Sequence, residues 1–174
     1  GPNEGSTATS PMIKWVAERE DGCVDPTNSM RALYEKQALQ PRVYAFAGLQ
    51  HFGDQRDTPQ GYREQLRRAW EMGFDGLKMW EEKPGMRKKL GYALDSALFE
   101  PLFAYAEEQG VPITLHAADP LECWDLNGPH ATYFRSRNWL CDESFPPRHQ
   151  IYQEIEGVMR RHPRLRLCLA HLSC

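Results

Sequence analysis

Short apolar runs alternate with amphipathic segments along the chain, and this alternation constrains the fold more than any other feature. Four runs rich in β-forming residues cover 43–49, 74–80, 111–116 and 165–171. The segments between them are long enough for the helical crossovers that parallel strands require. The runs are apolar throughout, which is typical of strands buried on both faces. The sequence therefore predicts an α/β fold with a parallel sheet covered by helices, and its periodicity leaves doubly wound and barrel folds both open.

Capping and breaking residues mark the expected helices. Thr58 followed by Pro59 is a typical helix start, and Gly110 a typical helix end. We expect helices over 29–39, from Pro59 to Gly73, over 96–109 and over 147–161. A polar loop is expected over 81–89, and 117–147 is interpreted as a long functional loop because it shows no sustained period.

Ionisable residues lie where the predicted strands end. His51 follows the first run, Lys78 lies in the second, and His116 and His171 end the third and fourth. The carboxyl ends of parallel strands share one edge, where α/β proteins place their chemistry. Imidazole is a common metal ligand, and burial favours the neutral, nucleophilic form of a lysine, which can react with carbon dioxide to give a carbamate. Each residue alone also fits a structural role, but together they favour a metal site.

Composition excludes several classes of function. Apolar residues make up 41% and charged residues 26% of the 174 residues, and the net charge of −3 argues against nucleic acid or an anionic membrane as the main partner. No apolar run approaches the roughly 20 residues of a membrane span. Residues 1–24 are interpreted as a tag remnant, a disordered lead-in or an unrecognised N-terminal segment. Five cysteines without a CxxC pair suggest reduced thiols and a cytoplasmic protein.

Several phrases of the sequence resemble the amidohydrolase superfamily. They are Gly76-Leu77-Lys78-Met79-Trp80, Ile113-Thr114-Leu115-His116-Ala117-Ala118-Asp119-Pro120, His162-Pro163-Arg164-Leu165 and Leu167-Cys168-Leu169-Ala170-His171-Leu172. They are most similar to the amidohydrolase-related branch that also holds non-oxidative decarboxylases. The resemblance covers 25–174 and implies strands three to six of a (β/α)8 TIM barrel. A whole barrel takes about 250 residues, so we expect this chain to be part of a longer protein.

The resemblance implies a role for each strand-end residue. His116 would bind a divalent metal, with zinc expected first and manganese, iron or nickel as alternatives. His171 would bind a second metal or assist proton transfer, and Lys78 matches a lysine that is carbamylated in binuclear members. Asp119 either orients a neighbouring histidine or caps a turn. The family's His-x-His pair is absent from the sequence, and its strand-eight aspartate falls beyond the strands recognised here.

We expect the substrate to be a small molecule. His51 and Trp80 are predicted to contact it from the strand ends, and Arg135, Arg137 and Trp139 from the long loop. Arginine pairs well with carboxylates, which suggests a carboxylate-bearing substrate, although solvated loop charges explain the arginines equally well.

Three functions remain open at this stage. The first is hydrolysis of an amide, ester or lactone by metal-activated water. The second is non-oxidative decarboxylation on the same scaffold, and the third is a catalytically incompetent or non-enzymatic domain. Homo-oligomerisation is left open.

Overall fold

A parallel four-stranded sheet forms the centre of the molecule. The computed structural model describes residues 26–39, 43–52 and 57–171. The strand order is β1-β2-β3-β4, and every neighbouring pair is parallel. The strands are β1 (Phe46–Gly48), β2 (Gly76–Met79), β3 (Ile113–His116) and β4 (Leu167–Ala170). This arrangement confirms the predicted α/β class. The segment 1–24 lies outside the described residues.

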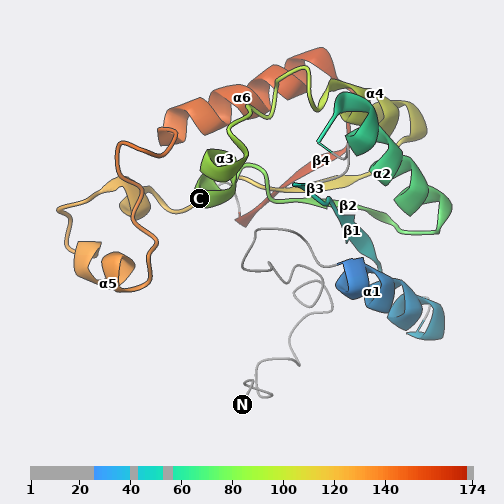
Figure 1. Ribbon diagram of the computed structural model, residues 1–174, viewed down its shortest axis with the longest axis horizontal. Coiled ribbons are helices and arrows are strands. Elements are labelled where there is room, and N and C mark those ends of the chain that lie inside the picture. The colour runs from blue at the N-terminus through green and yellow to red at the C-terminus, as the bar shows by residue number, and fades with distance from the viewer. Residues whose placement is uncertain (1–25, 40–42, 53–56, 172–174) are drawn as a thin grey trace.

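Helices connect the strands and cover the sheet. They are α1 (Pro26–Leu39), α2 (Pro59–Glu71), α3 (Pro84–Leu90), α4 (Glu100–Gln109), the 3-10 helix η3 (Leu121–Trp124), α5 (Ala131–Ser136) and α6 (Arg148–Arg161). Figure 1 shows α2, α4 and α6 along one side of the sheet, with α1 near β1. Among the described helices, none is both long and apolar enough to cross a membrane.

The core lies between the sheet and these helices. Its largest fully buried side chains are Tyr62, Phe99, Phe103, Leu49, Leu66, Leu77, Met79, Leu94, Leu102, Ile113, Leu115 and Ile151. Packing is close at Gly76, where an added Cβ would lie 2.4 Å from Phe46 Cε1 and 2.5 Å from the Pro112 carbonyl oxygen. Only glycine fits this approach of β1 to β2.

Most of the predicted boundaries agree with the structure. The Thr58 hydroxyl accepts a hydrogen bond from the Gly61 N–H, and Pro59 begins α2, as expected. Gly110 ends α4 with a φ of 66°, the left-handed conformation that glycine adopts readily. The strands are shorter than the apolar runs, because only part of each run pairs with a neighbouring strand.

Three expectations about local structure were wrong. The polar loop over 81–89 is instead helix α3, because Pro84 lies in the first helical turn, where its missing N–H has no cost. The long 117–147 connection contains η3 and α5. The helix expected over 96–109 begins at Glu100, after a series of turns.

Candidate active site at the strand ends

His116 and His171 meet at the carboxyl edge of the sheet. His116 is the last residue of β3 and pairs with Ala170, the last residue of β4, so His171 lies directly after the paired region. Their ring centroids lie 5.0 Å apart at an interplanar angle of 68°. Ala118 and His171 have φ values of 56° and 60°, a conformation that costs a non-glycine residue about 1–3 kcal/mol and is concentrated at functional sites. The structure thus brings together the two predicted metal ligands.

Asp119 holds the His116 ring from one edge. Its Oδ1 lies 2.9 Å from His116 Nε2, and the His116 side chain is buried. The other ring nitrogen, Nδ1, is buried and has no hydrogen-bond partner among the described residues. If Nε2–H donates to Asp119, the Nδ1 lone pair is available to bind an electrophile. This is the arrangement by which a carboxylate fixes the tautomer of a metal-binding histidine.

Trp80 forms a flat wall beside His116. The two rings are stacked, with centroids 5.2 Å apart and planes inclined by 12°. The ammonium groups of Lys78 and Lys83 each lie 5.2 Å from the centroid of the Trp80 ring. A predicted site residue, Trp80, and the unpredicted Lys83 therefore belong to the same cluster.

Burial and positive charge shift two pKa values here. Burial lowers the pKa of Lys78 to about 8, and the nearby Glu81 carboxylate partly opposes this shift. The pKa of His171 is also lowered, first by burial and then by His116, Lys78 and Lys83, while Asp119 acts in the opposite direction. Near neutral pH the cluster therefore holds a largely neutral His171 and a lysine that is close to titrating.

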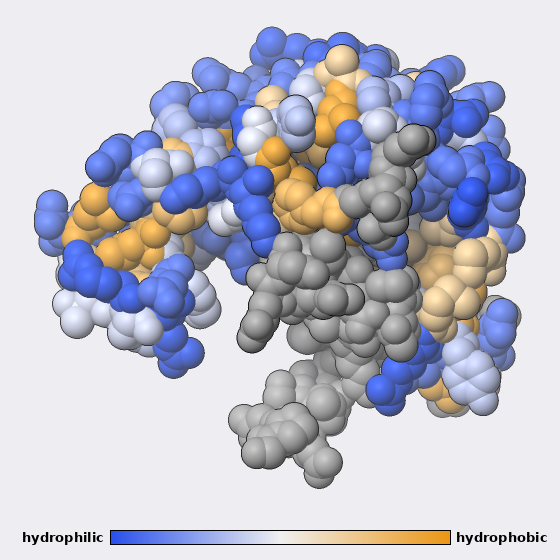
Figure 2. Space-filling view, viewed as in Figure 1, coloured by the Kyte–Doolittle hydropathy of each residue, from blue (hydrophilic) through white to orange (hydrophobic). Residues whose placement is uncertain are grey.

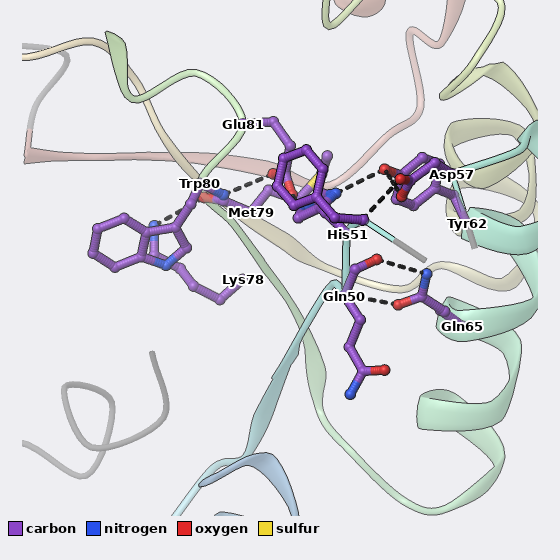
Figure 3. A network of polar contacts seen from close by, with 10 residues as sticks. Gln50, His51, Asp57, Tyr62, Gln65, Lys78, Met79, Trp80 and Glu81 are labelled. Carbon is purple, nitrogen blue, oxygen red and sulfur yellow. Dashed lines mark hydrogen bonds and ion pairs between the residues drawn. The ribbon is translucent and has the colours of Figure 1, made fainter. Parts of the chain in front are cut away.

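His51 lies inside the protein, within a chain of hydrogen bonds (Figure 3). It is 1% exposed, with Nδ1 2.7 Å from the Tyr62 hydroxyl and Nε2 2.9 Å from Glu81 Oε1. Asp57 accepts a hydrogen bond from the Tyr62 hydroxyl at 3.0 Å. The structure thus places His51 among core side chains, whereas we expected it to face the substrate.

The three predicted loop residues lie in α5 or just after it, and Figure 1 shows α5 on a lobe apart from the sheet. Arg137 lies 5.4 Å from the Tyr133 ring and 6.0 Å from the Trp139 ring, and Arg135 donates to the Leu126 carbonyl oxygen. Figure 2 shows apolar side chains at the surface of this lobe. The structure brings Arg137 and Trp139 together, but the contacts described for the lobe do not join either to the strand-end histidines.

Sequence reasoning missed Glu81 and Tyr62. Glu81 was assigned to a polar loop, yet it is 2% exposed. The available signal was its position, because Glu81 closely follows β2 at the edge of the sheet where the other site residues lie. Tyr62 is a buried residue of α2, and nothing in the local sequence indicates that its hydroxyl joins a polar network.

The predicted metal ligands can be compared with the donor atoms that the structure describes. No cluster of three or more His, Cys, Asp or Glu side chains suited to a metal occurs among residues 26–39, 43–52 and 57–171. The buried, unpartnered Nδ1 of His116 and the adjacent His171 imidazole nevertheless supply two nitrogen donors that suit zinc, manganese, iron or nickel. These residues therefore fit as part of a divalent-metal site.

Comparison with known proteins identifies the family. The Amidohydrolase family matches residues 19–173, and the chain belongs to this family. No curated protein matches the chain.

Two solved structures are similar to the chain, to different degrees. One is 2,6-dihydroxybenzoate decarboxylase complexed with 2,6-dihydroxybenzoate, with a TM-score of 0.55 and 19% identity over 94% of this chain and 49% of that chain. Another is an uncharacterized TIM-barrel protein, Bb4693, from Bordetella bronchiseptica, with a TM-score of 0.45 and 19% identity over 84% of this chain and 49% of that chain. The chain therefore spans about half the length of these structures, and the predicted partial TIM barrel is confirmed.

Proposed function

We propose that the strand-end cluster is part of the active site of a metal-dependent hydrolase. Its substrate is a small, carboxylate-bearing amide, ester or lactone. The observation that carries this proposal is the buried Nδ1 of His116, which lacks a partner among the described residues while Asp119 holds the opposite ring nitrogen and His171 lies alongside. Burying a polar nitrogen without a partner is costly, and a metal ligand is a physical reason to keep it.

His116 and His171 would hold the metal, with zinc as the first expectation. A divalent metal supplies a bound water of lowered pKa and polarises a carbonyl oxygen. Asp119 keeps the proton of His116 on Nε2, which preserves the Nδ1 lone pair. Because its pKa is lowered, His171 is largely neutral at pH 7, so a ring nitrogen that is not bound to metal can accept a proton.

Lys78, Lys83 and Trp80 favour an anionic substrate. The two ammonium groups lie on the same indole, beside the histidine pair. Lys83 can pair with a carboxylate, and Lys78 can do so in its protonated form. We propose this pair, in place of Arg135 and Arg137, as the first carboxylate-binding group.

A non-oxidative decarboxylase is the second candidate. The aromatic wall of Trp80 with its two lysines also suits an aromatic carboxylate, and 2,6-dihydroxybenzoate decarboxylase shares the fold. In such a reaction the bond from the ring carbon to the carboxyl carbon breaks, carbon dioxide leaves, and the ring carbon takes a proton. Lys78 in its ammonium form is a suitable proton donor.

We retain the cytoplasm as the predicted compartment. Cys123, Cys141 and Cys168 are free thiols, and Cys23 and Cys174 lie outside the described residues.

Metal content tests the proposal. Elemental analysis of the protein, after reconstitution with zinc or manganese, should find metal near one equivalent per chain, and His116→Ala should lose it. The metal-loaded protein should then hydrolyse members of a panel of carboxylate-bearing amides, esters and lactones. Carbon dioxide release from aromatic carboxylates without hydrolysis would select the decarboxylase. An absence of metal in both proteins would overturn the proposal in favour of a catalytically incompetent domain.

A further inference from the structure

A continuous hydrogen-bonded path connects the end of β1 to the end of β2 (Figure 3). It begins where Asp57 accepts the Phe52 N–H at 2.8 Å and the Tyr62 hydroxyl at 3.0 Å. It continues from Tyr62 through His51 to Glu81. It ends where the second oxygen of Glu81 accepts the Trp80 backbone N–H at 2.7 Å. Glu81 therefore spans two partners, one with each carboxyl oxygen.

Each hydrogen bond of this path needs one hydrogen, and assigning these hydrogens shows how many protons the His51–Glu81 pair holds. Tyr62 gives its only hydrogen to Asp57, so its oxygen must accept from His51 Nδ1–H. The 2.9 Å contact between His51 Nε2 and Glu81 Oε1 then needs a further hydrogen between the two atoms. A neutral imidazole with its proton on Nδ1 and an ionised carboxylate cannot supply one. The His51–Glu81 pair therefore holds one proton more than those two forms provide.

The His51–Glu81 pair is buried, and this restricts the positions that its side chains can take. Its side chains are 1% and 3% exposed, so water does not compete for these hydrogen bonds. Charge-assisted bonds of this kind are about twice as strong as neutral ones, and breaking one inside the protein leaves an unpaired charge. The backbone of Trp80 is thus held by a group that has little freedom to move.

We propose that the His51–Glu81 pair is a positioning element that fixes Trp80 against His116. The held Trp80 backbone anchors a side chain whose indole stacks on the His116 ring, with ring centroids 5.2 Å apart. The imidazole is then bounded by the indole on one face and by Asp119 at one edge. The hydrogen bonds of the pair reach the site through the Trp80 backbone, so we assign both residues a positioning role that acts through Trp80. This inference rests on the proposed function in one respect only, namely that His116 is a metal ligand.

Two variants of Glu81 distinguish the effect of its side-chain length from the effect of its negative charge. Glu81→Gln keeps the length of the side chain, since the amide oxygen can accept the Trp80 N–H and the amide nitrogen can donate to neutral His51. Glu81→Asp keeps the charge but is shorter by one methylene, so it cannot reach both partners. A positioning role predicts that Gln preserves the site and Asp disturbs it, whereas a purely electrostatic role predicts the opposite.

The proton chemical shift of the His116 ring reports the stacking directly. In EDTA-treated protein, the indole should move the His116 Cε1–H resonance upfield by its ring current. The Trp80→Leu variant gives the chemical shift of this proton in the absence of the indole. The His116→Ala variant assigns the resonance, because the His116 signal disappears from its spectrum. Glu81→Gln should keep the wild-type shift, and Glu81→Asp should move most of the way to the Trp80→Leu value. His162→Ala is the matched control, because it removes a buried imidazole paired with Glu100 at the opposite end of the strands, and it should leave the resonance in place.

The outcomes of this test are distinct from those of the proposed function. A wild-type shift in Glu81→Asp, or a lost shift in Glu81→Gln with a folded protein, would overturn the positioning role. If the expected shifts appear but no variant or wild-type protein binds zinc, the positioning role stands and the proposed function fails. If zinc binds, Glu81→Asp should weaken it by about tenfold or more, as is usual for groups that orient a metal ligand, while Glu81→Gln should bind as the wild type does.

Discussion

The Trp80 indole and the His116 imidazole lie nearly parallel, with centroids 5.2 Å apart and planes inclined by 12°. The two residues come from neighbouring strand ends, Trp80 following β2 and His116 ending β3. This stacking covers one face of the imidazole, and the contact with Asp119 fixes the rotation of the ring within its plane. A histidine held in this way presents one nitrogen in a defined direction, which is the requirement of a metal ligand.

Asp119→Ala should weaken metal binding without unfolding the protein. The substitution removes the acceptor at His116 Nε2, so the ring is free to change tautomer and orientation. Loss of such an outer partner typically costs about 10–100-fold in metal affinity. Zinc affinity measured by competition with a chelator checks this. The Asp119→Asn variant keeps an acceptor oxygen, so its zinc affinity should lie between those of the wild type and Asp119→Ala. Equal affinity in all three proteins would contradict the role assigned to Asp119.

Lys78 should react as a neutral amine at mildly alkaline pH. Burial lowers its pKa to about 8, so about half of the side chain is unprotonated at that pH. Acetylation by a limiting amount of reagent, followed by peptide mass spectrometry at several pH values, should give a half-maximal labelling rate of Lys78 near pH 8. The Lys78→Arg variant should lack this fraction of the label. Labelling that rises only well above pH 10 would show that the ammonium form is not destabilised.

Glu82 should make the protein less stable as pH rises. Burial, followed by the neighbouring Glu154 carboxylate, raises the pKa of Glu82 to about 9 from 4.5. Between these two values the folded protein keeps a proton that the unfolded chain has lost. This contribution to stability is therefore fully present below pH 4.5 and is lost as pH rises toward 9, with a slope of up to about 1.4 kcal/mol per pH unit.

The isosteric Glu82→Gln variant isolates this effect. Its amide does not titrate, so the free energy of unfolding should depend less on pH between 5 and 9 than that of the wild type. Urea denaturation across this window measures the difference. Identical slopes for the two proteins would show that Glu82 is ionised in the folded state.

Gly76→Ala should destabilise the sheet. The new methyl group would overlap Phe46 Cε1 at 2.4 Å and the Pro112 carbonyl oxygen at 2.5 Å, and the latter belongs to the backbone entering the neighbouring strand. Overpacking of this kind costs about 1–3 kcal/mol. Gly85→Ala is the matched control, because nothing lies within 4 Å of its added Cβ and alanine favours helix α3. Urea midpoints should fall for the first variant and stay level or rise for the second.

The sequence predicted the parts of this protein that depend on local pattern. The apolar runs predict the four strands β1 to β4, and the positions of His116 and His171 at strand ends predict that they meet. Helix α3 was missed because Pro84 and Gly85 are helix breakers everywhere except in the first turn. The His51–Glu81 pair was missed because its partners are 30 residues apart, and no local period marks a contact formed by tertiary packing.

The strand order has a consequence for how the site is assembled. Each strand of the sheet pairs with the strand that precedes it in the chain, so no strand has to wait for a distant partner. Contacts of short sequence separation form early, and a chain leaving the ribosome can add one strand and its helix at a time. Lys78 and Trp80 are then in place first, His116 joins them with β3, and His171 arrives with β4. The histidine pair is complete only when the fourth strand docks, so any change that slows this docking should delay the appearance of metal binding behind the formation of most of the secondary structure.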